Sequence, residues 1–282
     1  MAACLPAPAA MTKRIASLAV IAVFAFTRAE AAPLKVVTWN LHHGRDINGH
    51  NTVDAQARWL AAERPDIVLL QEAEQFSAGY GNFDHVTYIQ NKLQAESGRP
   101  YHAFWSNASG ARYGKGAVNA ILSVFNLVSM DGRSLPYGVP LTMANVQVLP
   151  ARTIALFCIH LTSAIGNDAK RATQVAELTY WLTVRGVTTR LGGGDWNLVP
   201  ASVPIAPMRY WYTDLYDKGR SQGDFSGPTD TRPVYQSNSV VGRIDALFLG
   251  KSWPSWITLT AVEHVNTGLS DHFAVIAQLD VR

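Results

Sequence analysis

Two side chains that could act on a phosphate, Asp195 and Asn197, follow three consecutive glycines in the segment 191–198, Leu-Gly-Gly-Gly-Asp-Trp-Asn-Leu. In an extended chain, side chains two positions apart point to the same face. A carboxylate and a carboxamide held side by side can orient a water molecule or bind a phosphate oxygen. Because glycine loses more backbone entropy on folding than any other residue, we expect these three to serve a purpose, namely close approach of the strand end to phosphate. The alternative is an ordinary loop in which Asp and Asn form turns.

Residues of the same kind recur where other apolar strands are predicted to begin or end. Taken singly, a strand-end Asn or Asp is usually a turn former, and a lone His is usually a core or surface imidazole. Their shared placement at strand ends, where the sites of α/β sheets gather, favours one common site. The residues are Asn40, Glu72, His160, Asp195 with Asn197, Asp245, and Asp271 with His272.

Alternating strand and helix patterns must position these residues. Residues 34–39, 53–63 and 67–71 predict strand, helix and strand, a βαβ-like unit that delivers Asn40 and Glu72 at the strand ends. The stretch from 200 to about 239, rich in Pro, Tyr and Trp, is expected to be irregular. The remaining pattern predicts helices at 86–96 and 168–184 and strands at 100–105, 117–123, 142–148, 152–160, 244–249 and after 272.

The N-terminus predicts a secretory signal peptide over residues 1–31. Lys13 and Arg14 precede an apolar run at 15–26, and Ala-Glu-Ala at 29–31 offers small residues suited to cleavage. The run of about a dozen apolar residues is short for a bilayer span, although an uncleaved anchor is the alternative. No later segment is apolar for long enough to cross a membrane. We therefore expect a secreted or periplasmic protein with one domain over 33–282 and no integral membrane segment.

Charge and cysteine content narrow the classes of function. The 24 Lys and Arg against 21 Asp and Glu give a formal net charge of +3. Loss of residues 1–31 would remove three positive charges and one negative charge, leaving +1. Charge alone therefore gives no strong electrostatic footprint for nucleic acid. Cys4 would leave with the signal, and Cys158 sits in an apolar strand as a small core residue, so no disulfide is expected.

An ordered set of short motifs covers nearly the whole chain after the signal. The motifs are Thr38-Trp39-Asn40, Leu70-Gln71-Glu72, Asn119 to Ser123, Ile159-His160-Leu161, Gly194 to Asn197, Arg243-Ile244-Asp245 and Leu269 to His272. With these motifs in this order, the chain resembles the endonuclease/exonuclease/phosphatase family, which includes pancreatic-type deoxyribonucleases, sphingomyelinases and inositol-polyphosphate phosphatases. The resemblance implies a four-layer α/β sandwich, with two mixed β-sheets packed face to face and helices on the outside.

The resemblance also assigns a metal site. Hydrolysis of a phosphodiester needs a cation to neutralise the phosphate and a base for the attacking water. Glu72, with Asn40 and Asp271, would hold Mg²⁺, or Mn²⁺, through hard oxygen ligands. His42 occupies a position where several relatives carry an acid; His42 or His43 could bind metal, hold structure or face substrate.

The remaining family residues would handle water, protons and phosphate. His272 would be the general base or its equivalent, oriented by Asp245. Asp195 and Asn197 would position the water and the phosphate. His160 would donate a hydrogen bond to the phosphate or act as acid to the leaving group. Three residues of a polar loop are candidates for contact with substrate phosphate: Arg112, Tyr113 and Lys115.

These observations favour an exported, divalent-metal-dependent phosphoesterase that hydrolyses phosphodiester bonds, and within that class a non-specific nuclease with nucleic acid as substrate. The alternative enzyme is a sphingomyelinase-type lipid phosphodiesterase or an inositol or small-molecule phosphatase, since the same site would serve. Aromatic residues at 200–216 and 253–256 could then face a lipid surface. A third possibility is a non-catalytic binding module. No protein partner is implied.

Overall fold

Two mixed β-sheets form the centre of the computed structural model, which describes residue 1 and residues 31–184, 188–232 and 242–282. The predicted signal peptide lies outside the described residues except at its two ends. The first sheet has the strand order β10 (Phe225–Ser226), β12 (Ile257–Val265), β13 (Ala274–Val281), β1 (Ala32–Asn40), β2 (Ile67–Gln75), β4 (Gly116–Ser123) and β3 (His102–Asn107). The second has the order β5 (Leu127–Leu135), β6 (Val139–Leu149), β7 (Arg152–His160), β8 (Arg190–Asp195), β11 (Asp245–Gly250) and β9 (Tyr212–Asp214).

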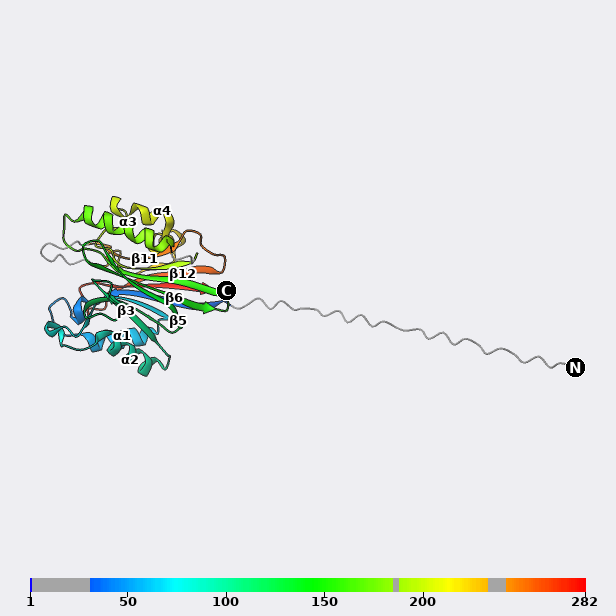
Figure 1. Ribbon diagram of the computed structural model, residues 1–282, viewed down its shortest axis with the longest axis horizontal. Coiled ribbons are helices and arrows are strands. Elements are labelled where there is room, and N and C mark those ends of the chain that lie inside the picture. The colour runs from blue at the N-terminus through cyan, green and yellow to red at the C-terminus, as the bar shows by residue number, and fades with distance from the viewer. Residues whose placement is uncertain (2–30, 185–187, 233–241) are drawn as a thin grey trace. The chain divides into compact units, whose positions relative to one another are not determined.

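Helices cover the outer faces of both sheets, as Figure 1 shows. α1 (Val53–Glu63) and α2 (His85–Ser97) pack on the first sheet, and α3 (Asp168–Val184) and α4 (Ala206–Trp211) pack on the second. A short helix, α5 (Leu215–Gln222), follows β9, and single 3-10 turns occupy His42–Gly44, Ala78–Tyr80 and Val203–Ile205. The predicted four-layer α/β sandwich is confirmed.

Alternation along the central strands builds the layers. In β2, Leu69 belongs to the core between the sheets, whereas Leu70 packs under α1 and α2. In β7, Leu156 faces the other sheet, whereas Phe157 packs under α3 and α4. Successive strand residues point to opposite faces, so a strand covered on both sides is apolar throughout. This is why the central strands were recognisable as unbroken apolar runs.

Two strands and the segment before β11 differ from the sequence expectation. The sequence pattern does not predict β5, because Asp131, Gly132 and Arg133 give this half-exposed edge strand a polar composition. β12 was passed over, although Ile257 and Leu259 alternate with exposed threonines as in an ordinary half-buried strand. The stretch expected to be irregular contains α4, β9, α5 and β10, which are too short for periodicity to reveal.

The glycine run lies in the middle of the second sheet. β8 pairs in parallel with β7 and antiparallel with β11. A Cβ atom at Gly192 would lie 2.0 Å from the carbonyl oxygen of Phe157, and one at Gly193 would lie 1.9 Å from that of Ala246. The absence of side chains at these glycines thus lets the neighbouring strands pack closely against β8. This role differs from the close approach to phosphate expected from the sequence.

Two smaller expectations concern cysteine and the membrane. Cys158 is a free, buried cysteine in β7, as predicted. Among the described residues, no helix has the length and apolar character needed to cross a membrane.

Replacement of Gly193 tests the role of the glycine run. Gly193→Ala should lower the free energy of unfolding by about 3 kcal/mol or more, or prevent folding, because the new methyl group overlaps a backbone carbonyl that cannot rotate away. Gly79→Ala is the matched control, since a Cβ there meets no atom within 4 Å. Urea unfolding of both variants provides the measurement. A Gly193→Ala protein as stable as Gly79→Ala would contradict the packing described here.

Candidate active site

The predicted site residues meet at one end of the two sheets. Asn40 ends β1, and Glu72 lies in the adjacent strand β2 of the first sheet. In the second sheet, His160 ends β7 and is the register partner of Asp195, which ends β8. Asp245 opens β11 and lies opposite Asp195 in the antiparallel pair. Three neighbouring strands of the second sheet therefore deliver His160, Asp195 and Asp245 side by side, and the first sheet supplies Asn40 and Glu72.

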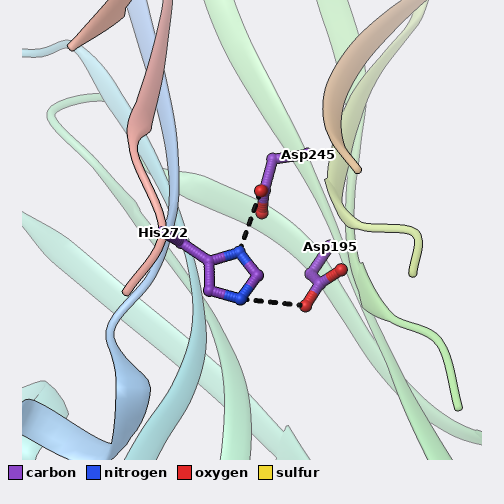
Figure 2. A group of neighbouring side chains, drawn as sticks. All are labelled: Asp195, Asp245 and His272. Carbon is purple, nitrogen blue, oxygen red and sulfur yellow. Dashed lines mark hydrogen bonds and ion pairs between the residues drawn. The ribbon is translucent and has the colours of Figure 1, made fainter. Parts of the chain in front are cut away.

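His272 enters from the loop before β13 and joins two carboxylates (Figure 2). Its Nδ1 lies 2.9 Å from Asp245 Oδ2, and its Nε2 lies 3.7 Å from Asp195 Oδ2. The backbone of His272 is fixed as well: its N–H donates to Ser270 Oγ, and its carbonyl accepts from the Trp39 indole N–H. All three titratable side chains are buried. Buried charges need partners of opposite sign, and here one imidazole pairs with two carboxylates; we call Asp195, Asp245 and His272 the ion triad.

The triad shifts the pKa values of its members. Burial alone would lower the pKa of His272, but the charges of Asp245, Asp195 and Asp271, with the hydrogen bond to Asp245, outweigh burial and raise the pKa to about 10. Burial raises the pKa of Asp195; His272 opposes this effect and the neighbouring Asp245 adds to it. The imidazole is therefore held as the charged form at neutral pH.

Asn40 and His160 connect the carboxylates of the two sheets. Asn40 Nδ2 donates to Glu72 Oε1 at 3.1 Å and to Asp195 Oδ2 at 3.0 Å. Its Oδ1 accepts from the backbone N–H of His42 at 2.9 Å. His160 Nε2 lies 3.6 Å from Glu72 Oε1 and 3.5 Å from Asp195 Oδ2. Two nitrogen-bearing side chains thus stand between the two acids.

Glu72 projects from a β-bulge. The apolar run predicts a strand that ends at Gln71, but β2 continues to Gln75, and its register with β4 shifts between Leu70 and Ala73. Glu72 has a left-handed backbone with φ of 53° at this irregularity. A bulge re-aims a side chain without ending the strand, and here it turns the carboxylate into the site.

The ionisation of Glu72 is set by its imidazole neighbours. Burial alone would raise the pKa of this carboxyl group. The positive charges of His160, His43 and His272, with the Asn40 hydrogen bond, outweigh burial and lower the pKa to about 2. Glu72 is consequently an anion across the physiological pH range.

Asn197 reaches the site through a turn. Its backbone is left-handed, with φ of 47°, and its N–H donates to Asp195 Oδ1 at 2.8 Å. Its Nδ2 donates to the carbonyl of Leu161 at 2.9 Å. The chain is therefore not extended from Asp195 to Asn197: β8 ends at Asp195, and the Asx-type turn that follows is the alternative that the sequence left open for this stretch.

Strained backbone is concentrated around the site. Five non-glycine residues that line the open cavity at this end of the sheets have a left-handed backbone: His42, His43, Glu72 and Asn197, with φ between 47° and 56°, and Ala164, with φ of 72°. Left-handed conformations of such residues cost about 1 kcal/mol or more each and cluster at functional sites.

Arg232 is a site residue that sequence reasoning missed. Its Nη2 lies 2.6 Å from Asp271 Oδ2, and both side chains are nearly buried. The adjacent Thr231 hydroxyl accepts from the backbone N–H groups of Ile244 and Asp245, which fixes the start of β11. Both residues lie in a stretch without strand or helix periodicity, so no local pattern identified them. Asp271 also lies 3.6 Å from His42 through its Oδ1 and the ring Nδ1.

An open cavity of about 470 Å³ gives access to these groups. Of the predicted site residues, Glu72, His160, Asp195, Asn197, Asp271 and His272 line it, together with His42, His43, Tyr80 and Arg232. Asn40 and Asp245 lie behind this lining as hydrogen-bond partners.

The three predicted phosphate contacts lie outside that lining. Arg112 stacks over the Phe104 ring, Tyr113 packs edge-on against Phe104 and Trp105, and Lys115 lies over Phe76. Their loop joins β3 to β4. Contact of these side chains with substrate stays a prediction.

The donor groups allow a test of the predicted metal site. In the described part of the chain, one set of three metal-competent side chains has all its ligand atoms within 4.8 Å: Asp195, Asp245 and His272. That set is buried and bonded internally, whereas Mg²⁺ usually keeps several waters. Glu72 is a carboxylate with 17% side-chain exposure on the cavity wall, and Asp271 has a buried Oδ1 that accepts no hydrogen bond from the residues that the structure describes. These two oxygens fit a hard divalent cation, whereas Asn40 presents its nitrogen to the carboxylates in this structure.

Solved structures of several proteins share this fold over nearly their whole length. The endonuclease/exonuclease/phosphatase from Bacteroides vulgatus has a TM-score of 0.68 at 14% identity, over 89% of this chain and 100% of that one. D. rerio TDP2 complexed with single strand DNA product has a TM-score of 0.66 at 18% identity, over 88% and 99%. The human Nocturnin catalytic domain with bound sulfate has a TM-score of 0.65 at 15% identity, over 89% and 95%.

Sequence comparison gives the family directly. No curated protein matches the chain. The model of the endonuclease/exonuclease/phosphatase family matches residues 37–272, which is most of the chain and spans every strand that delivers a site residue. The chain therefore belongs to the endonuclease/exonuclease/phosphatase family, whose members are hydrolytic phosphoesterases.

Proposed function

We propose that this protein is an exported phosphodiesterase that uses a bound divalent metal to hydrolyse nucleic acid, with single-stranded DNA as its preferred substrate. The observation that carries the proposal is the convergence of Glu72, Asp195 and His272 on one open cavity. The likeness in fold to D. rerio TDP2, which was solved with single strand DNA product, supports DNA as substrate. The signal-like pattern of residues 1–31 supports export to a periplasm or to the medium.

The shape of the site supports an extended substrate. A second cavity of about 260 Å³ shares Glu72, His160 and Ser163 with the site cavity. It continues between Ala108 and Ala117, the flanks of the loop that carries Arg112, Tyr113 and Lys115. A polymer lying along both cavities would bring its backbone towards these side chains, whereas an isolated phosphate would fill only the first.

The metal would be held by Glu72 and Asp271, and these two oxygen ligands taken alone suit Mg²⁺, with Mn²⁺ as the alternative. A bound divalent cation neutralises charge on the phosphate and on the leaving oxygen. Glu72 suits this role because its low pKa keeps it anionic. Arg232 orients Asp271 through its Oδ2, and within the described part of the chain Oδ1 accepts no hydrogen bond.

Protons are handled by the groups around Asp195. With its pKa raised to about 10, His272 is an imidazolium at neutral pH, so we assign it the donation of a hydrogen bond to the phosphate rather than the base role expected from sequence. Asp195 would accept the proton of the attacking water, because burial raises its pKa. Asn197 would position the water or the phosphate, and His160 would donate to the phosphate or to the leaving oxygen.

A lipid-phosphodiesterase role receives less support. Tyr210 and Trp211 are exposed, but they line a cavity beside Arg190, which begins β8, whereas Asp195 ends that strand at the active site. Trp253 and Trp256, also considered for a lipid-facing edge, pack against the core between the sheets. These aromatic residues are not arranged around the site cavity.

Cleavage of a labelled single-stranded oligonucleotide tests the function. Hydrolysis should require Mg²⁺ or Mn²⁺ and stop with chelator. Glu72→Gln and His272→Ala should each lower turnover by about 10² to 10⁴, because each removes a group that stabilises the transition state. His50→Ala is the matched control, since its side chain is 76% exposed and pairs with Asp46.

Two outcomes would contradict different parts of the proposal. Absence of DNA and RNA cleavage with every divalent metal, together with release of phosphocholine from sphingomyelin or of phosphate from an inositol phosphate, would reject the nuclease and favour the alternative. Full turnover in Glu72→Gln or His272→Ala would reject the assigned roles.

The charge of His272 gives a separate prediction. Asp245→Asn removes the anion bonded to its Nδ1, so the pKa of His272 should fall by about 1 to 3 units. Because the charged form is the active one in this assignment, the alkaline limb of the pH–rate profile should move to lower pH by the same amount. NMR titration of the ring protons measures the shift, with His50 as internal control. An unchanged His272 pKa would refute the electrostatic account of the triad.

A further inference from the structure

His43 lies against the carboxylate that we assign to the metal. Its ring Nε2 is 3.1 Å from Glu72 Oε2, and its side chain is 28% exposed on the cavity wall. Two ligands of one ion, each about 2.0 to 2.2 Å from it, lie about 3 to 3.4 Å apart at right or tetrahedral angles. The two atoms are therefore spaced as neighbouring ligands of a single ion.

The other ring nitrogen of His43 is fixed by a buried acid. His43 Nδ1 lies 2.6 Å from Glu74 Oε1, and the Glu74 side chain is 3% exposed. The Ser77 hydroxyl donates to the second oxygen of Glu74, and the Tyr80 ring stacks on the imidazole with centroids 4.5 Å apart. A histidine that binds metal through one nitrogen almost always donates from the other to a carboxylate or carbonyl in this way.

The backbone holds His43 in an unfavourable conformation. His42 and His43 have φ of 48° and 56°, and the next residue, Gly44, has φ of 75°. Gly44 is buried, and a Cβ there would lie 2.9 Å from the His85 ring. Gly44 adopts positive φ without steric cost, but two consecutive left-handed histidines are costly, so packing around this turn determines where the imidazole points.

We infer that His43 is a nitrogen ligand of the metal held by Glu72, and that this site therefore selects a first-row transition ion, Zn²⁺ or Mn²⁺, over Mg²⁺. The inference rests on the metal-dependent function proposed above. Imidazole suits transition ions, whereas Mg²⁺ prefers oxygen ligands and water. The sequence alone left the role of His43 open between metal binding, structure and substrate contact.

Calorimetric titration of the purified, tag-free protein with ZnCl₂, MnCl₂ and MgCl₂ tests this inference. The unaltered protein should bind Zn²⁺ and Mn²⁺ more tightly than Mg²⁺. His43→Ala should weaken Zn²⁺ binding at least tenfold and change Mg²⁺ binding by less than about threefold, because only the nitrogen ligand is lost. His50→Ala should leave all three affinities unchanged.

A second variant acts on His43 without removing it. Glu74→Gln keeps the shape of the side chain but removes the anion bonded to Nδ1, and it should weaken Zn²⁺ binding by about 10- to 100-fold. The visible absorption of the Co²⁺-loaded protein provides an independent signature, since loss of a nitrogen ligand in His43→Ala should alter the spectrum. Circular dichroism confirms that each variant is folded before titration.

The outcomes separate this inference from the function on which it rests. Equal Zn²⁺ affinity and an identical Co²⁺ spectrum in His43→Ala and the unaltered protein would overturn the inference and leave His43 as an ion-pair partner of Glu72. In that case, loss of Mg²⁺ binding in Glu72→Gln would still support the metal-dependent function. Unchanged binding of every metal in Glu72→Gln would instead overturn the metal site itself.

Discussion

The burial of several carboxylates beside one imidazole is the interaction on which the rest of the structure depends. Asp195 and Asp245 come from adjacent strands of one sheet, and neither is more than 1% exposed. Two such charges at close range would oppose folding unless a cation joined them. His272 supplies that cation from the other sheet, and its position is secured through Ser270 and Trp39. The two sheets must therefore pack in the one arrangement that brings His272 against Asp195 and Asp245.

Close strand packing makes this meeting possible. The glycines of β8 let β7 and β11 lie against it, so that His160, Asp195 and Asp245 end up side by side. On the facing sheet, a bulge turns Glu72 towards them, and Asn40 bonds to carboxylates from both sheets. The site is thus a product of backbone geometry in the sheet centre as much as of the side chains that line the cavity.

Much of this was accessible from the sequence, for identifiable reasons. Central strands covered on both faces appear as apolar runs, so β1, β7 and the strand ends at Asn40 and His160 were predicted where they occur. The βαβ unit was correct because the buried residues of α1 recur at helical spacing and Pro65 follows the end of the helix. Features that depend on contacts between distant parts of the chain could not be predicted from local sequence patterns. The bulge at Glu72 depends on pairing with β4, and Arg232 reaches Asp271 across 39 positions from a segment without periodicity.

The central claim is that Asp195 and His272, brought from different sheets, act as one unit on a phosphodiester. A double-mutant cycle measures this most directly: turnover of a single-stranded oligonucleotide by Asp195→Asn, by His272→Ala and by the double variant, with the metal held constant. Residues that act as a unit lose activity non-additively, so the double variant should be about as slow as the slower single variant. A loss in the double variant equal to the product of the two single losses would contradict the account.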